Sequence, residues 1–122
     1  MRSFIITLLL LLAMLCGIFC NHLYINNVAS EMLERLDKLP DITSEECARS
    51  CRELLEYWNQ QLSLAELSAS YTLVDKVSEQ ATLLVACAEC GDRYGFRSAS
   101  ELLRDAIGDM RRLEELSLGN IF

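Results

Sequence analysis

The chain is poor in the residues that interrupt helices. Its 122 residues include one proline and five glycines. Leu, Ala, Glu and Ser are abundant instead, and the first three of these favour helices. Because proline and glycine mark turns and end regular elements, their scarcity leaves room for long uninterrupted helices. The composition therefore predicts an all-α fold.

Positive charge and histidine are also scarce. The formal net charge is −7, with 11 Lys and Arg against 18 Asp and Glu, and His22 is the single histidine. Nucleic-acid phosphates need clustered basic side chains, so we expect no nucleic-acid partner. A lone histidine near the N-terminus gives no Ser-His or Cys-His pair to the rest of the chain, and the acidic residues fall on the expected solvated helix faces. We therefore expect no enzymatic activity and no cofactor.

One long apolar run dominates the N-terminal part. Residues 3–20 carry no charge, and as a helix they span about 27 Å, which is enough to cross a bilayer. The positions behind this run hold large or polar residues such as Phe19 and Asn21, where signal peptidase requires small ones. We predict an uncleaved transmembrane anchor over residues 1–25, with a cleaved secretory signal as the alternative.

Charges on either side of the anchor predict its orientation. Arg2 precedes the apolar run, whereas the acidic Glu31 is the first charged residue after it. The positive-inside rule then places the N-terminus in the cytoplasm and residues 26–122 outside. The expected localisation is the cell membrane, crossed once. Three polar or aromatic side chains form the expected interfacial belt: Asn21, His22 and Tyr24.

Helical spacing of apolar residues predicts a bundle after the anchor. A juxtamembrane helix over residues 26–40 continues the anchor, and Pro40 ends it because the residue before a proline is driven out of the helical region. Residues 41–122 then form an extracytoplasmic bundle. The predicted architecture is an N-terminal transmembrane helix followed by a small antiparallel three- to four-helix bundle.

Capping signals divide this bundle into helices. In chain order the predicted boundaries are a capping box at Thr43 and Glu46, a Ser-rich break at 67–72, a helix end at Gly91, a loop at 91–97 and a second capping box at Ser98 and Glu101. Seven apolar side chains of the last helix are predicted to point inward: Leu102, Leu103, Ala106, Ile107, Met110, Leu113 and Leu116.

Four cysteines lie in two pairs on the second and third predicted helices. If these helices form a hairpin that turns near Ser68, Cys47 faces Cys90 and Cys51 faces Cys87. The crossed pairing would need opposite shifts along the two helices. Because the space outside the membrane is usually oxidising, we predict these two disulfides.

Other interpretations of the cysteines remain open. Four thiolates between helices could bind a structural zinc ion, a C-x-x-C pair could be redox-active, and all four could be reduced core thiols. The helix dipole disfavours thiolates at the end of the third helix, and neighbouring glutamates disfavour one near the start of the second. The alternative function is a metal-binding or thiol-redox module that uses Cys47, Cys51, Cys87 and Cys90.

One aromatic residue and the C-terminal segment are candidates for a partner surface. Trp58 lies in the apolar stripe of the second helix, where a core position is the more ordinary role. The end of the chain carries two large apolar residues, which suggests that it docks. The predicted partner is another envelope protein or a second copy of the chain, contacted through Trp58, Asn120, Ile121 and Phe122.

The same features carry a resemblance. An N-terminal anchor, Trp58 in a middle helix, the segment Leu-Val-Asp-Lys-Val at 73–77 and the ending Ser-Leu-Gly-Asn-Ile-Phe at 117–122 resemble a family of uncharacterised clostridial membrane-associated proteins, domain of unknown function 4363. Members of that family often carry a histidine in the segment that corresponds to 68–71, and they usually lack these cysteine pairs. The resemblance implies a bacterial, single-pass helical protein with no known activity or catalytic residues.

Overall fold

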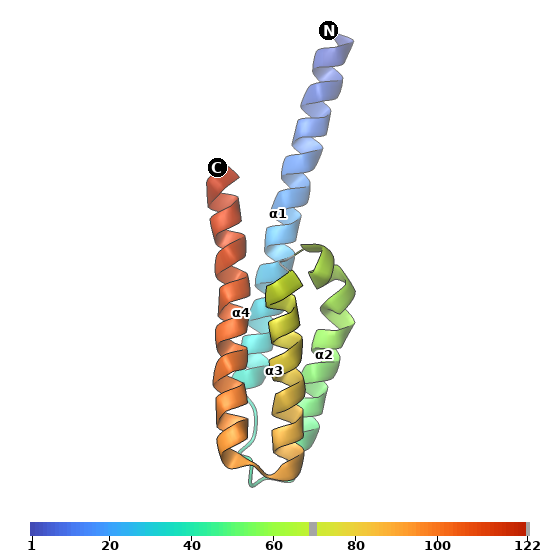
Figure 1. Cartoon of the computed structure of the whole chain (residues 1–122). Helices are drawn as coiled ribbons and strands as arrows, with labels where there is room; N and C mark the ends of the chain where they lie inside the picture. Colours follow the sequence, from blue (N-terminus) through green and yellow to red (C-terminus); the bar gives the residue numbers. More distant parts are fainter. Residues whose placement is uncertain (69–70, 122) are drawn as a thin grey trace.

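A computed structural model shows four α-helices joined by short connections (Figure 1). It describes residues 1–68 and 71–121, except for the side chains at positions 64, 66–68, 117, 118, 120 and 121. In chain order the helices are α1 (Arg2–Asp37), α2 (Glu46–Ser68), α3 (Tyr71–Cys90) and α4 (Arg93–Ile121). The described residues contain no strand, so the predicted all-α fold with a long apolar N-terminal helix is confirmed.

α1 is one unbroken helix with two different halves. None of its most apolar 18-residue stretch is buried, and this stretch is long and apolar enough to cross a membrane. The other half contributes Ile25, Ala29, Met32 and Leu36 to the core. These residues recur at helical intervals, which places them on one face of α1. α1 ends shortly before Pro40, as the restriction that proline puts on preceding residues predicts.

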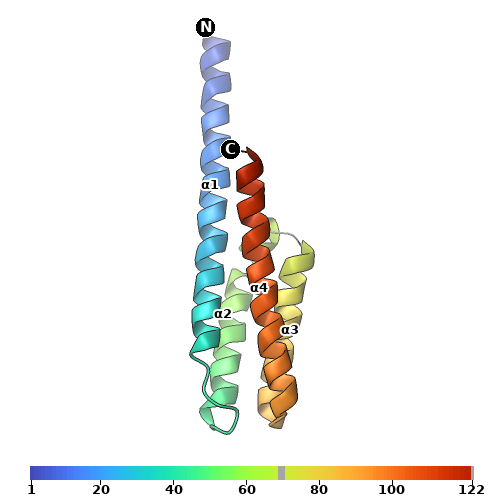
Figure 2. The same ribbon diagram turned by 90° about the vertical axis from the view of Figure 1, so that its left-hand side faces the viewer.

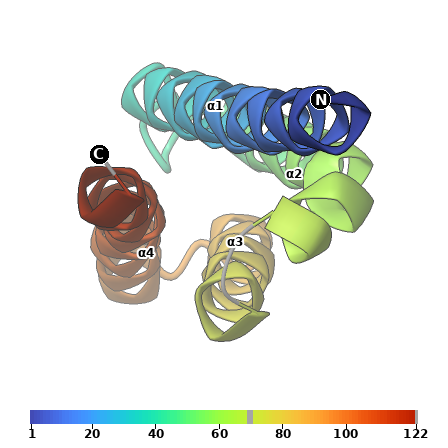
Figure 3. The same cartoon turned by 90° about the horizontal axis from the view of Figure 1, so that it is seen from above.

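The four helices alternate in direction and pack as a ring. α1 and α3 each lie beside α2 and α4, whereas in the described residues no Cα atoms of the diagonal pairs come within 8 Å of each other. Seen from above, the helices surround a common axis (Figure 3). α4 runs antiparallel to α1, and its C-terminal end is level with the middle of α1, above the end of α2 and the start of α3 (Figures 1 and 2). The arrangement is an up-down-up-down four-helix bundle.

We call the exposed apolar part of α1, before Ile25, its bare half. Below it, an apolar core fills the space between the four helices. Trp58 on α2 is its largest side chain and is 0% exposed. The indole Nε1 donates a hydrogen bond of 2.7 Å to Oγ of Ser78, which satisfies the polar atom of the ring and ties α2 to α3. No polar or charged residue in the described part of the chain is buried. Apolar packing therefore holds the bundle together.

α2 begins later than its capping pattern predicts. The expected N-cap was Thr43, but the helix starts at Glu46. Asp41 makes a turn of its own, because its Oδ1 accepts the backbone N–H of Thr43 and its carbonyl oxygen accepts that of Ser44. The hydroxyl of Ser44 then accepts the N–H of Glu46 at 3.2 Å. The prediction at Thr43 is wrong because an Asx turn, which short acidic side chains favour, holds this residue outside the helix. The predicted break at 67–72 is narrower than expected, because α2 extends to Ser68 and α3 begins at Tyr71. The two residues between them, 69 and 70, lie outside the described residues.

α3 ends at a glycine, as predicted. Gly91 has a φ of 70°, a left-handed conformation that costs glycine little. The backbone N–H groups of Gly91 and Asp92 donate to the carbonyl oxygens of Ala88 and Cys87. This pair of hydrogen bonds is the Schellman C-cap, which satisfies carbonyl groups that the helix end would leave unpaired.

α4 begins immediately after this C-cap, so the predicted loop at 91–97 is wrong. Oδ1 of Asp92 accepts the backbone N–H of Gly95 at 3.0 Å, which makes Asp92 the N-cap of α4. Ser98 and Glu101 consequently lie inside the helix rather than at its start. The capping signal of Asp92 was present in the sequence, but two neighbouring glycines made the segment look like a loop.

The inward face of α4 is narrower than predicted. Four of the seven expected residues are buried: Leu103, Ala106, Ile107 and Met110. Leu102 is 48% exposed, since it lies about 100° around the helix from Leu103. Leu113 and Leu116 are 42% and 65% exposed, because they lie beyond the last core residue of α4. The inward assignments of these three leucines are wrong.

Candidate functional site

The two cysteine pairs lie at the end of the bundle that is farthest from the bare half of α1. Cys47 and Cys51 are buried on α2. Cys87 is buried on α3 and faces the start of α4, since a Cβ added at Gly95 would lie 2.7 Å from its Sγ. Cys90 is exposed. The α2–α3 hairpin thus brings both pairs to one end of the molecule, where Cys87 faces the start of α4.

All six cysteines are free thiols, and no two of them lie at disulfide distance. The predicted bridges, Cys47 to Cys90 and Cys51 to Cys87, are therefore not supported and stay a prediction. A disulfide requires Cα atoms about 5.5–6 Å apart. Helices that pack bulky side chains between them lie about 8–10 Å apart, and α2 buries residues of that size, Leu54 and Trp58.

Burial opposes ionisation of three thiols. Burial and the neighbouring Cys47 raise the pKa of Cys51 to about 12. Burial also raises the pKa of Cys47 and of Cys87, and the nearby Asp92 carboxylate raises that of Cys87 further. The thiolate is the reactive form in redox chemistry and in metal binding, so these thiols are held in their unreactive form at neutral pH.

The zinc interpretation gains no support from the arrangement. No three His, Cys, Asp or Glu side chains in residues 1–68 and 71–121 that the structure describes are placed to hold a metal ion. The four cysteines of the predicted cluster all lie in those ranges. A structural zinc site needs its sulfur ligands about 2.3 Å from one common point.

Trp58 does not belong to a partner surface. Its ring is enclosed by the bundle and its N–H is used by Ser78, so the prediction that it contacts a partner is wrong and its core role is confirmed. The other candidates for that surface, the side chains of Asn120, Ile121 and Phe122, lie outside the described residues. The backbone of α4 is nevertheless helical up to Ile121.

The polar side chains expected at the membrane interface connect α1 to its neighbours. Nδ2 of Asn21 donates a hydrogen bond of 3.0 Å to Oε1 of Glu114 on α4. The hydroxyl of Tyr24 lies 3.1 Å from the carbonyl oxygen of Gln61 on α2 and 3.0 Å from its side-chain oxygen. His22 is half-buried between these two residues, and its Nδ1 has no hydrogen-bond partner. These residues mark the level at which the bundle begins.

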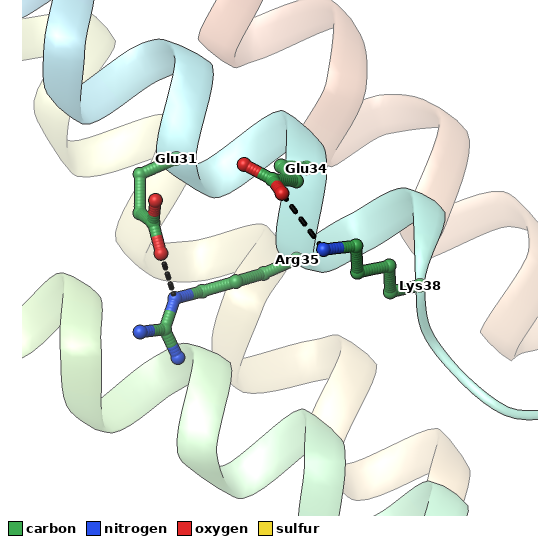
Figure 4. A network of polar contacts seen from close by, with 4 residues as sticks. All are labelled: Glu31, Glu34, Arg35 and Lys38. Atoms are coloured by element: carbon green, nitrogen blue, oxygen red, sulfur yellow. Dashed lines mark hydrogen bonds and ion pairs between the residues drawn. The ribbon is translucent and has the colours of Figure 1, made fainter.

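The last turns of α1 carry two exposed ion pairs (Figure 4). Nε of Arg35 lies 2.9 Å from Glu31, and Nζ of Lys38 lies 2.7 Å from Glu34. The hydrogen bond from Lys38 holds the pKa of Glu34 below its ordinary value. The guanidinium of Arg35 also lies over the ring of Tyr57 on α2, 4.5 Å from its centre. Exposed pairs of this kind stabilise weakly. The contact between Arg35 and Tyr57 links this end of α1 to α2.

A hollow between α3 and α4 was missed by sequence reasoning. It has a volume of about 370 Å³, and seven residues line it: Lys76, Glu79, Gln80, Leu102, Asp105, Ala106 and Asp109. Three carboxylates face one ammonium group there, and Oε1 of Gln80 is buried without a hydrogen-bond partner. The sequence signal for it was Leu102, an apolar residue one position away from the inward stripe. We call these seven residues the α3–α4 hollow.

In comparisons with known proteins, the chain matches no protein-family model, no curated protein and no solved structure. The resemblance to the clostridial family stays a prediction. The fold itself defines a class, namely a four-helix protein in which one helix is long and apolar enough to cross a membrane.

Proposed function

We propose that the protein is a non-enzymatic, membrane-anchored helical module of a bacterial cell envelope, which binds another envelope protein or a second copy of itself. The observation that carries this proposal is the division of α1. Its apolar stretch is bare, although the other half of the same helix is packed into the core. An exposed apolar helix of this length is costly in water and stable in lipid.

The N-terminus of the anchor lies in the cytoplasm, and the bundle lies on the outer side of the membrane. Arg2 is the one charged side chain before Glu31, so the positive-inside rule supports this orientation. The anchor is retained in the mature protein, because the residues behind it do not fit signal peptidase. The protein should therefore stay with membranes during alkaline carbonate extraction, and its intact mass should include residues 1–20.

The α3–α4 hollow is the surface we assign to the protein partner. Leu102 gives the lining of the hollow an exposed apolar side chain, and four charged side chains share that lining. Protein interfaces have this anatomy, in which an apolar core is rimmed by polar groups. The lining carries more negative than positive charge, since three carboxylates (Glu79, Asp105 and Asp109) accompany one ammonium group (Lys76). The partner segment that fits is an amphipathic one with an apolar residue flanked by Lys or Arg.

In-cell photo-crosslinking tests this assignment. A photoreactive amino acid in place of Leu102 should capture a protein, which mass spectrometry of the crosslinked band identifies as a partner or as a second copy of the chain. Tyr94 is the matched control, because it is 89% exposed on the same helix but outside the hollow. The same photoreactive residue at position 94 should capture nothing specific. If position 102 also captures nothing and the full-length protein is monomeric in detergent, the proposal is abandoned.

The thiol and metal alternative is not favoured by a specific observation. The raised pKa values of Cys47, Cys51 and Cys87 disfavour the thiolates that such a module would need.

A further inference from the structure

We infer that the C-terminal turns of α4 lie in the membrane interface beside α1, so that the bundle meets the bilayer through two helices rather than one. The inference rests on the proposed anchoring of α1 and adds a second membrane contact, whose ligand is the lipid surface itself. It follows from the register between α1 and α4, from the burial pattern of α1 and from the chemistry of the end of α4.

Polar contacts fix the register of the antiparallel pair at three levels. Arg104 pairs with Asp37 at 2.6 Å, and Nε of Arg111 donates a hydrogen bond of 2.8 Å to Asn26. The third contact, at the level where the bare half of α1 begins, is the 3.0 Å hydrogen bond from Asn21 to Glu114. From Arg104 to Glu114 along α4, the contacted residues of α1 therefore fall from Asp37 to Asn21.

α4 continues beyond the last of these contacts. The helix extends from Glu114 to Ile121, which adds about 10 Å at 1.5 Å per residue. In the established register these turns lie beside α1 between its residues 14 and 20. Both side views show the end of α4 level with the middle of α1, beyond the end of α2 and the start of α3 (Figures 1 and 2). This level belongs to the apolar stretch that the anchor places in the membrane.

The burial pattern of α1 agrees with this position. Within residues 1–20 all side chains are exposed except those of Leu15 and Ile18, which are half-buried. These two residues continue the helical stripe that leads to Ile25 in the core. The burial at Leu15 and Ile18 therefore shows how far the contact between α1 and its bundle neighbours extends into the apolar stretch.

The end of α4 has the chemistry of a lipid-facing segment. Glu115 is its last charged side chain, and residues 116–122 read Leu-Ser-Leu-Gly-Asn-Ile-Phe. Leu116, the last large apolar side chain that the structure describes, is 65% exposed rather than packed. The core of the bundle has already ended at Met110 on this helix. A solvent-exposed apolar end is costly in water, whereas lipid at this level removes the cost.

The depth of insertion is limited by the backbone. The last four carbonyl groups of a helix have no intrahelical partner, and leaving them unpaired in hydrocarbon costs several kcal/mol each. The interfacial layer still supplies water and head groups. We therefore place these turns in the interface, with Glu114 and Glu115 on its aqueous side.

Tryptophan fluorescence in nanodiscs tests this inference on the full-length chain. Leu116→Trp introduces a reporter at the end of α4, and Leu102→Trp introduces the same reporter on the bundle part of that helix. Trp58 is 0% exposed and gives both variants the same background. Acyl-brominated phosphatidylcholine should quench the added signal severalfold in Leu116→Trp and leave that of Leu102→Trp unchanged. Acrylamide in the buffer should show the opposite pattern.

A third variant separates this inference from the anchoring on which it rests. Leu10→Trp lies in the bare half of α1 and should be quenched by the brominated lipid. If Leu10→Trp is quenched but Leu116→Trp responds only to acrylamide, or to neither quencher, the membrane contact of α4 is refuted and the anchor stands. If Leu10→Trp also escapes the brominated lipid, the anchoring proposal itself fails. Far-UV circular dichroism of each variant confirms that the helices are retained.

Discussion

At the scale of single residues, the buried cysteines behave as apolar packing groups. Cys47 and Cys51 are 1% and 0% exposed on α2. Their neighbourhood favours the protonated thiol, so their contribution lies in the packing of α2. Two predictions follow from the difference between these residues and the exposed Cys90.

Alkaline pH should destabilise the bundle through Cys51. Its pKa is about 12 in the folded protein, against an ordinary value of 9.0. The folded state therefore holds this proton more tightly, and the associated stability is complete below about pH 9 and is lost as the pH rises towards about 12. Cys51→Ala removes the titrating group, so its free energy of unfolding in urea should fall less over this range than that of the wild type.

Cys90→Ala is the matched control, because it removes an exposed thiol and should leave the alkaline loss unchanged. An equal loss in the wild type and both variants would contradict the prediction. Tyr57 would then contribute to the alkaline limit, since burial raises the pKa of its hydroxyl as well.

Alkylation should distinguish the free thiols of the structure from the disulfides that the sequence predicts. In the folded, non-reduced protein in detergent, Cys90 should react with iodoacetamide well before Cys47, Cys51 and Cys87, because those three are buried and protonated. After denaturation without reductant, mass spectrometry should count six alkylated cysteines. Two alkylated cysteines would instead establish the two bridges.

At the scale of the elements, apolar periodicity predicted the helices and the local turns determined their ends. The buried residues of α2 and α3 recur at helical spacing, and this periodicity does not depend on how the helices are connected. The starts of α2 and α4 were misplaced, because Asp41 and Asp92 each used a carboxylate to make a turn or a cap of its own. Which of several neighbouring Asp, Ser and Thr side chains caps a helix depends on hydrogen bonds that compete over two or three residues.

Two glycines of α4 should respond in opposite directions to substitution by alanine. A Cβ at Gly95 would lie 2.5 Å from Oδ2 of Asp92 and 2.7 Å from Sγ of Cys87, so Gly95→Ala disturbs the N-cap and should cost about 1–3 kcal/mol. A Cβ at Gly108 meets nothing within 4 Å. Gly108→Ala should therefore stabilise the helix by about 1 kcal/mol through its higher helix propensity. Urea unfolding followed by circular dichroism measures both, and a loss of stability in Gly108→Ala would contradict this account.

At the scale of the whole molecule, the membrane-facing half of α1 and the core are separable. Every core residue of α1 lies at or after Ile25. A chain that lacks residues 2–20 should consequently keep its helical circular dichroism signal and unfold cooperatively. Removal of residues 2–32 also deletes Ile25, Ala29 and Met32, so this chain should show no cooperative transition. If the shorter deletion already abolished cooperative unfolding, the bare half of α1 would have to contribute to the fold.

The relative positions of the helices went beyond what the sequence could predict. Composition and spacing were sufficient for an all-α bundle behind an apolar helix. The hydrogen bond between Asn21 and Glu114 joins residues 93 positions apart, and the α3–α4 hollow depends on how two helices are rotated against each other. Rotation and register are set by the fit of many side chains at once. For the same reason Leu102, one position from the inward stripe, was assigned to the core and lies in the hollow.

The continuity of α1 also has a mechanical consequence. No proline occurs within this helix, and the same helix holds both the apolar stretch and the core residues from Ile25 onwards. A transmembrane helix adjusts to a thinner or thicker bilayer by tilting, and a helix without a kink passes that tilt on as a rigid rod. In a thinner bilayer the bundle would lean with the rod. The end of the bundle farthest from the membrane, where Gly91 and Asp92 connect α3 to α4, would be displaced most.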